Sequence, residues 1–263
     1  MLARVTALCA ALLLAGCANG YEKFYQSVPP PTTGFAPVAG EPQLTSGTTD
    51  ARGTVIQMFQ SGYGLVGLAD FTGPAQDRAG AIAQAKKVGA SLIVVSQKFQ
   101  NTVSGTIPLT LPTSTTSYSS GTANAYGTGG YASGTYSGTT TTYGTQTTNI
   151  PYSVDRYEQT ALFFAPLQRR GLGIFVAPLT DAQRQQIGTN QAVQIVAVRN
   201  GSPAFLADVL PGDYLASIDG KPVYDAASVA QAFTQAAGHA AQLALLHNGQ
   251  KVSKSVPVPA AEW

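Results

Sequence analysis

Residues 201–223 read GSPAFLADVLPGDYLASIDGKPV, and this stretch decides the fold of the C-terminal part of the chain. Ser202 is a good helix N-cap, and Pro203 suits the first position of a short helix. The dipeptide Asp219-Gly220 is a strong signal for a two-residue hairpin turn. The stretch therefore predicts a short helix, then a strand, then a tight hairpin.

Caps, apolar runs and turn dipeptides continue on both sides of this stretch. Asp225 is placed to cap a second helix, and Asn248-Gly249 is another hairpin dipeptide. The strands predicted around them cover residues 174–176, 193–198, 214–218, 242–247 and 252–258.

This ordered set resembles a bacterial PDZ domain of the kind found in HtrA-type envelope proteases. The residues that carry the resemblance are Arg169-Arg170-Gly171-Leu172-Gly173-Ile174-Phe175-Val176, Gly201-Ser202-Pro203-Ala204, Leu210-Pro211-Gly212-Asp213 and Ile218-Asp219-Gly220-Lys221-Pro222-Val223. The resemblance covers about ninety residues and implies a PDZ-like β-barrel with two helices over residues 167–259.

The resemblance also implies that a peptide or protein terminus binds by strand addition. The N–H groups of Leu172, Gly173 and Ile174 would receive a terminal carboxylate, while Gly171 and Gly173 allow close approach of the backbone. We expect Gly173→Glu to block capture and, at an exposed edge, to leave the domain folded. The implied peptide-binding residues are Gly171, Leu172, Gly173, Ile174, Phe175, Val176, Arg169, Arg170, Ala227 and Gln231.

Two of these assignments leave alternatives open. Arg169 and Arg170 either attract the carboxylate over a long range or form a solvated pair at a domain junction. On the second helix, Val229 and Phe233 are interpreted as core residues, which leaves Ala227 and Gln231 as the positions that face the peptide.

Residues 54–166 predict a small α/β domain with a ββαββ-like order. The predicted strands are Val55–Phe59, Tyr63–Phe71, Ser91–Ser96 and Arg156–Phe164. Between the second and third strands, Ala79, Ile82, Ala83 and Val88 recur at helical spacing, with Pro74 in the first turn and Gly89 at the C-terminus. The whole chain is thus of mixed α+β class.

Residues 113–149 interrupt this domain. Thr, Ser, Gly and Tyr fill 31 of these 37 positions, and no charged residue lies between Lys98 and Asp155. Such a composition buries little apolar surface, so we predict a flexible loop. The alternative is a long, flat hairpin that carries five tyrosines.

The N-terminus predicts a targeting segment. Residues 1–16 have a short cationic start and an apolar run, and Leu14-Ala15-Gly16-Cys17 resembles a bacterial lipobox. The resemblance implies cleavage before Cys17 and lipidation of its thiol, and Ala18 points to the outer membrane. The Pro-rich residues 17–53 predict a tether, part of which packs on the first domain through Tyr21, Phe24, Tyr25 and Phe35.

Charge and composition exclude several function classes. A net charge of +2 provides no basic field for nucleic acid. No histidine precedes His239, so a serine-protease triad has no base upstream of the PDZ-like part. His239 and His247 are interpreted as structural or surface residues. We therefore expect no enzyme, no cofactor and no metal.

The sequence favours a lipid-anchored adaptor of the cell envelope that binds a protein terminus or loop. It leaves open a structural surface lipoprotein in which the PDZ-like part is a packing module, and an accessory subunit of an envelope protease. A strand or tail of the same chain lying over the edge formed by residues 171–176 would argue against the adaptor.

Overall fold

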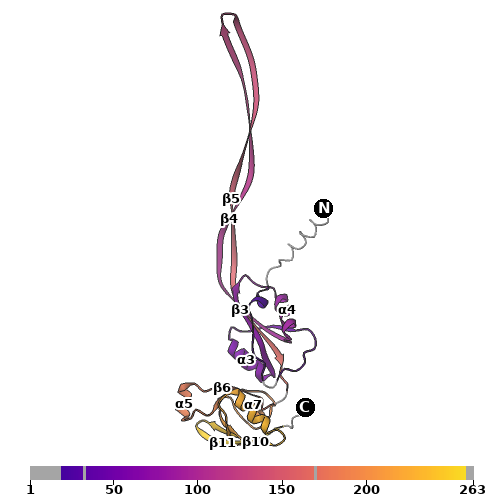
Figure 1. Cartoon of the computed structure of the whole chain (residues 1–263), viewed down its shortest axis with the longest axis vertical. Coiled ribbons are helices and arrows are strands. Elements are labelled where there is room, and N and C mark those ends of the chain that lie inside the picture. Colours follow the sequence, from indigo (N-terminus) through magenta and orange to yellow (C-terminus); the bar gives the residue numbers. More distant parts are fainter. Residues whose placement is uncertain (1–18, 32–33, 169–170, 259–263) are drawn as a thin grey trace. The chain divides into compact units, whose positions relative to one another are not determined.

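The computed structural model describes residues 19–31, 34–168 and 171–258. Two β-sheets organise them, one of five strands and one of six (Figure 1). This arrangement confirms the mixed α+β class. The predicted signal segment 1–16 and Cys17 lie outside the described residues.

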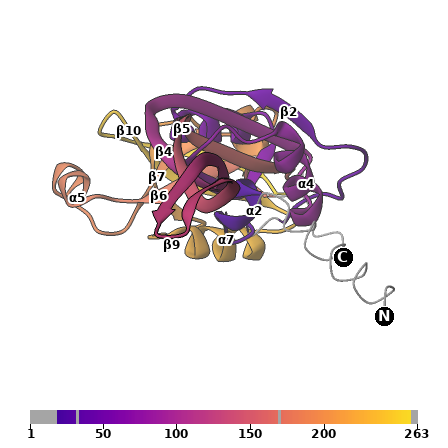
Figure 2. The ribbon, with the colours of Figure 1, turned by 90° about the horizontal axis from the view of Figure 1, so that it is seen from above.

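The first sheet has the strand order β1-β3-β5-β4-β2. Strand β2 runs parallel to β4, whereas β1 and β5 both pair antiparallel with β3. Helices α2 and α4 lie next to each other (Figure 2). The elements of this sheet are α2 (Gly20–Lys23), β1 (Tyr25–Ser27), β2 (Gln43–Ser46), α3 (Ala51–Gln60), β3 (Tyr63–Gly73), α4 (Arg78–Val88), β4 (Leu92–Gly127) and β5 (Gly130–Pro166).

Helices cover both faces of the first sheet. Successive side chains of a strand point to opposite faces, so Phe163 and Phe164 of β5 lie in different layers. Phe163 packs in a cluster with Ala81 of α4, whereas Phe164 packs in another cluster with Val55 of α3. Both phenylalanines are fully buried, which explains the continuous apolar run at this end of β5.

The predicted strand Val55–Phe59 is wrong, because these residues belong to helix α3. The Oδ1 atom of Asp50 accepts a hydrogen bond from the Gly53 N–H at 2.9 Å, which caps the helix. Val55 and Met58, three positions apart, then face the same cluster. Capping and packing thus outweigh the β-propensity of the sequence.

Helix α4 and strand β3 agree with the prediction, although the details of the helix differ. The predicted strands Ser91–Ser96 and Arg156–Phe164 fall largely within β4 and β5, but both strands extend far beyond the predicted bounds. The N-cap of helix α4 is Asp77, so Pro74 precedes the helix instead of lying in its first turn. Its buried positions include Ala81 and Ala85, whereas Ala79 and Ala83 are exposed. Gly89 has a left-handed conformation, with φ of 72°, and ends the helix as predicted.

The described part of the predicted tether 17–53 is largely built into the domain. Strand β1 pairs with β3, and β2 pairs with β4, so this segment supplies both outer strands of the sheet. Tyr21 is only 5% exposed, and the ring of Tyr25 packs edge-on against Phe163. The predicted packing of these aromatic residues is therefore correct, but the interpretation of the segment as a tether is wrong.

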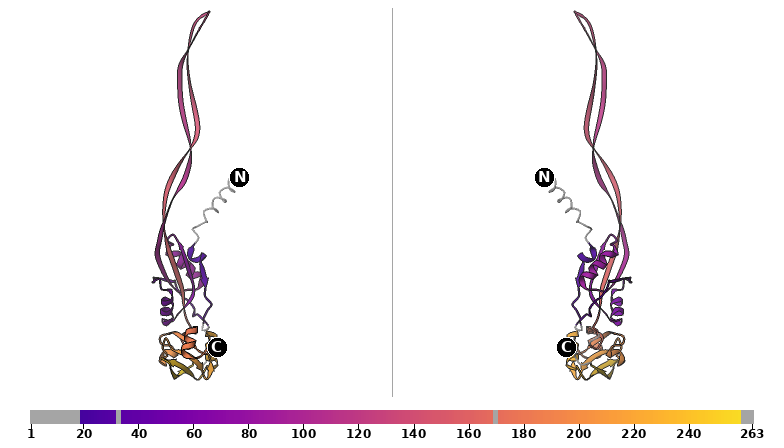
Figure 3. Two further views of the ribbon diagram at one scale, coloured as in Figure 1. Left: turned by 90° about the vertical axis from the view of Figure 1, so that its left-hand side faces the viewer. Right: turned by 90° about the vertical axis from the view of Figure 1, so that its right-hand side faces the viewer.

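The predicted loop 113–149 is wrong, and the hairpin alternative holds. Strands β4 and β5 continue through this segment and turn at Thr128-Gly129. They lie side by side in every view (Figure 3). Residues Asn101–Arg156 form a unit of their own. The high Thr content favours extended strands. Hydrogen bonds between β4 and β5 supply partners for the backbone groups that face each other, so the hairpin needs no hydrophobic core for them.

The second sheet has the order β11-β10-β8-β7-β6, with β9 paired to β8. It encloses its own core, in which Leu215, Ile218 and Leu243 are fully buried. Helix α5 is an addition that the sequence analysis did not predict. The elements are β6 (Ile174–Pro178), α5 (Asp181–Ile187), β7 (Val193–Val198), α6 (Pro203–Leu206), β8 (Tyr214–Ile218), β9 (Lys221–Pro222), α7 (Ala226–Gln235), β10 (Ala240–His247) and β11 (Gln250–Pro257).

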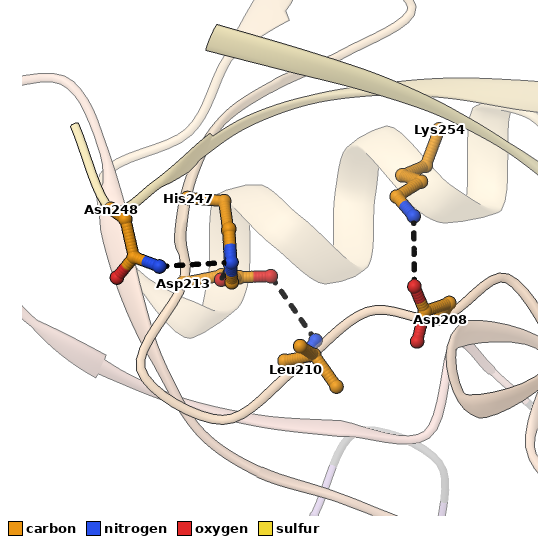
Figure 4. A network of polar contacts seen from close by, with 6 residues as sticks. All are labelled: Asp208, Leu210, Asp213, His247, Asn248 and Lys254. Atoms are coloured by element: carbon orange, nitrogen blue, oxygen red, sulfur yellow. Dashed lines mark hydrogen bonds and ion pairs between the residues drawn. The ribbon is translucent and has the colours of Figure 1, made fainter. Parts of the chain in front are cut away.

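The turn at Leu210–Asp213 is fixed by a buried carboxylate (Figure 4). Asp213 is 5% exposed and accepts a hydrogen bond from the Leu210 N–H at 3.1 Å. Its other oxygen lies 2.6 Å from Nδ1 of His247. A buried carboxylate requires such partners, so this contact gives His247 a structural role.

His239 lies in a second carboxylate contact, 3.1 Å from Asp219. The Gln242 N–H donates to Asp219 at 2.7 Å, and this bond, together with the one from His239, lowers the pKa of the Asp219 carboxyl. Because Asp219 starts the turn between β8 and β9, His239 also serves the fold.

Candidate functional site

Strand β6 is an edge strand with one open side. It pairs antiparallel with β7 through Ile174 opposite Val198 and Phe175 opposite Ala197. Within residues 19–31, 34–168 and 171–258, no strand pairs with its other side. The chain therefore leaves this edge uncovered wherever the structure describes it.

The main chain of Ile174 faces the open side. The Arg199 N–H donates to the Gly173 carbonyl at 2.8 Å, and this bond flanks the pair formed by Ile174 and Val198. In an antiparallel ladder, a pair flanked in this way exchanges no hydrogen bonds of its own. The N–H and C=O of Ile174 therefore point away from β7.

The loop before β6 presents two further N–H donors. The N–H groups of Leu172 and Gly173 donate no hydrogen bond to any residue that the structure describes. Their carbonyls, in contrast, are both held, because the Ala204 N–H donates to Leu172 at 3.1 Å and the Arg199 N–H donates to Gly173. The carbonyls are thus fixed, while the three consecutive N–H groups of residues 172–174 have no acceptor among the residues that the structure describes.

Gly173 is required by the fold, which contradicts the expectation that Gly173→Glu leaves the domain folded. Its φ is +75°, a left-handed conformation that side chains disfavour. A Cβ atom here would also lie closer than 3.0 Å to Cβ of Ser202. Because Ser202 caps helix α6, it cannot move without disturbing that helix. Gly171 also has a positive φ, of 85°.

Half-buried apolar side chains line the strip between β6 and α7, which are in contact. Ile174 and Val176 of β6 and Phe233 of α7 pack against the core while remaining partly exposed. Leu172 is only 4% exposed and belongs to the core itself. The arrangement offers an apolar strip beside a row of backbone donors.

The core interpretation of Val229 and Phe233 agrees with their packing, although Phe233 is also partly exposed beside β6. Val229 is buried and Phe233 packs against the core, whereas Ala227 and Gln231 are exposed. The exposure of Ala227 and Gln231 leaves them accessible to a ligand.

Phe175 does not face the open side. Its main chain pairs with Ala197, and its ring packs against the ring of Phe59 at a centroid distance of 5.6 Å. Arg169 and Arg170 lie outside the described residues.

Arg199 is a positioning residue that the sequence analysis missed. It is 7% exposed, and its Nη1 donates to the Gln168 carbonyl at 3.0 Å, while its backbone N–H holds Gly173. It therefore fastens the chain on both sides of the Gly171–Gly173 loop. An arginine at the end of an apolar strand gives no sequence signal of this role.

Comparison with known protein families identifies this part of the chain. Residues 171–258 match the PDZ domain family, so the chain contains a PDZ domain. No curated protein matches the chain.

Two solved structures of the HtrA-type protease AlgW with decapeptide are similar to part of the chain. One is a variant form with 25% identity and a TM-score of 0.31, covering 39% of this chain and 38% of that chain. The other has 24% identity and a TM-score of 0.30, covering 38% and 37%. The chain thus spans less than two fifths of their length.

None of the helices within residues 19–31, 34–168 and 171–258 is long and apolar enough to cross a membrane. No group of three His, Cys, Asp or Glu side chains gathers there at a potential metal site.

Proposed function

We propose that the PDZ domain binds the C-terminal segment of a partner protein by adding it as a strand to β6. The observation that carries this proposal is an edge that no described strand covers, where the N–H groups of Leu172 and Gly173 donate to no described residue and the main chain of Ile174 faces outward. A strand edge with unmet backbone donors is the surface that strand addition uses.

The terminal carboxylate is received by the three N–H groups of Leu172, Gly173 and Ile174. Hydrogen bonds to an ionised acceptor are about twice as strong as neutral ones, so a free carboxylate is favoured over an internal segment. The last side chain of the partner packs on the apolar strip formed by Ile174, Val176 and Phe233. The protein acts as an adaptor without catalytic activity of its own.

Hydrogen exchange of single amides tests this assignment. Addition of short peptides with a free C-terminus and an apolar last residue to the full chain is expected to slow exchange at Leu172, Gly173 and Ile174 at least tenfold, because these amides gain acceptors. Phe175 is the matched control, since its amide already faces β7. Slowing at Phe175 with no change at residues 172–174 would refute strand addition at this edge.

The adaptor is held in the cell envelope by lipid on Cys17, with the mature chain on the outer membrane. The support is the sequence Leu14-Ala15-Gly16-Cys17 after an apolar run. Each buried acyl CH₂ contributes about 0.8 kcal/mol, so two or three acyl chains anchor a protein stably.

Cys17→Ser is expected to abolish palmitate labelling and to release the protein from the membrane fraction. Cys9→Ser is the matched control and retains labelling, because Cys9 lies in the segment that cleavage removes. Labelling and membrane fractionation in a lipoprotein-processing host measure both variants. Unchanged labelling of Cys17→Ser would show that the anchor is elsewhere.

A further inference from the structure

The unit Asn101–Arg156 is a two-stranded ribbon in which β4 and β5 lie next to each other, and over these residues neither strand pairs with a third strand that the structure describes. Nearly all of its residues are exposed on both faces. Its outer edges therefore carry rows of N–H and C=O groups that face no other strand. Proteins protect such edges with lysine, proline or bulges. Residues 101–156 contain no lysine.

The ribbon keeps a single register. Side-chain hydrogen bonds join Thr102 to Asp155, Thr110 to Thr147 and Thr116 to Thr141. The rings of Tyr126 and Tyr131, near the turn, lie 4.9 Å apart. In each pair, one residue stands as far from the turn as the other, so no bulge shifts the ladder between them.

The two-residue turn determines which residues face the outer edges. The residues that flank such a turn, Gly127 and Gly130, exchange hydrogen bonds with each other. Bonded and non-bonded pairs then alternate away from the turn. Even-numbered residues of β4 and odd-numbered residues of β5 consequently direct their N–H and C=O groups outward.

All three prolines of the ribbon stand at outward-facing positions. Pro108 and Pro112 are even-numbered residues of β4, and Pro151 is an odd-numbered residue of β5. Proline cannot donate a hydrogen bond, so these residues remove donors from the outer edges while leaving the ribbon's own ladder intact. They obstruct strand addition along the basal ribbon, residues 101–112 and 145–156.

The distal ribbon, residues 113–127 and 130–144, carries no proline and no charge. Both of its edges are open over the same length, and neither carries a charge that would repel an identical strand. An isolated two-stranded hairpin is at best marginally stable in water, and independent stability needs three or more strands with an apolar face or packing against a helix. The distal ribbon therefore gains stability from additional strands.

One face of the basal ribbon is also apolar. The exposed side chains Ile107, Leu109 and Leu111 of β4 share a face with Ile150 and Tyr152 of β5, because odd residues of β4 oppose even residues of β5. An exposed apolar patch of this kind on a soluble surface marks an interaction site.

We propose that copies of this chain associate edge to edge through the distal ribbon, with β4 of one copy against β5 of the next. With the turns aligned, each outward-facing donor of residues 113–127 meets an outward-facing acceptor of residues 130–144. With the turns aligned, each proline of one copy lies at the same distance from the turn as the same proline of the next copy, so all of them fall in the basal ribbons. They remove donors from the basal edges, which therefore do not pair.

A second copy fits this surface better than an unrelated strand does. It offers an edge of the same length without proline. Side chains also continue to alternate between the two faces of the sheet across the junction, so the apolar faces of neighbouring basal ribbons lie on the same side of the joined sheet. Because the two edges differ, the contact is head to tail and can repeat. Two-stranded ribbons coil more strongly than wider sheets, so association flattens the distal ribbon.

Proline substitutions test the proposal with a matched pair. Thr116→Pro removes an outward donor from the distal ribbon, and Thr110→Pro removes one from the basal ribbon between Pro108 and Pro112. Each variant loses one Thr–Thr hydrogen bond across the ribbon, to Thr141 and Thr147 respectively. Any loss of ribbon stability that comes from losing this hydrogen bond is therefore the same in the two variants.

Sedimentation velocity of the full chain, in one detergent and over a concentration series, measures association. We expect concentration-dependent oligomers for the native chain and for Thr110→Pro, and at least tenfold weaker association for Thr116→Pro. Circular dichroism verifies that the two variants have equal strand content. A native chain that stays monomeric, equal association of the two variants, or equal loss in both would each overturn the proposal. None of these outcomes depends on peptide binding by the PDZ domain.

Discussion

Gly173→Ala is expected to lower the free energy of unfolding of the PDZ domain by about 3–5 kcal/mol. Few single substitutions cause a loss this large, and those that do act through backbone strain, steric overlap or a lost helix cap. The left-handed backbone at Gly173 costs an alanine roughly 1–2 kcal/mol. The remainder comes from the new Cβ, which would lie too close to Ser202 and would displace the cap of helix α6. Domains are stable by only about 5–15 kcal/mol, so this loss is a large fraction of the total stability.

Gly220→Ala provides a control at nearly the same backbone angle. Gly220 has a φ of +76°, against +75° for Gly173, but no atom lies within 4 Å of the position its Cβ would take. Its loss is expected to stay near the conformational cost of roughly 1–2 kcal/mol. Urea titration of the full chain, monitored by hydrogen exchange in β10, measures both variants. Equal losses would mean that the contact with Ser202 does not constrain the loop.

The PDZ domain could be predicted closely because its elements are delimited by local signals. The Ser202 and Asp225 caps and the Asp219-Gly220 and Asn248-Gly249 turns act within a few residues of themselves. Strand β10 alternates between exposed and buried positions over most of its length, so its register follows from the pattern.

The first domain was harder to predict because its outer strands depend on partners distant in sequence. Strand β2 pairs with residues almost fifty positions later, and its four residues carry no strong pattern of their own. Val55 and Ile56 favour strands intrinsically, but the Asp50 cap and the packing against Phe164 select a helix. Long-range packing of this kind cannot be read from local propensity.

Parts of the candidate site also escaped prediction. The glycines of the loop were identified, yet the contact that forbids a side chain at Gly173 comes from Ser202, nearly thirty residues away. Arg199 holds the same loop by donating a hydrogen bond to the Gln168 carbonyl. Every residue has such a carbonyl, so the sequence does not indicate which one an arginine will contact.

We propose that the PDZ domain recognises a free C-terminus through the amides of Leu172, Gly173 and Ile174. A carboxylate held by these donors loses its charge when it is converted to an amide, and the amide also brings donors of its own. Hydrogen bonds to charged groups contribute about 1.5–3 kcal/mol each, so loss of one corresponds to at least a tenfold weaker complex.

The most direct test is a titration of the full chain with a C-terminal peptide library in which each sequence is presented both as the free acid and as the C-terminal amide. Paired peptides share every side chain, so their difference isolates the carboxylate. We predict that the acids bind and that their amides bind at least tenfold more weakly. Equal affinity of the two forms would contradict the claim, since the peptide would then bind without engaging the donors of residues 172–174.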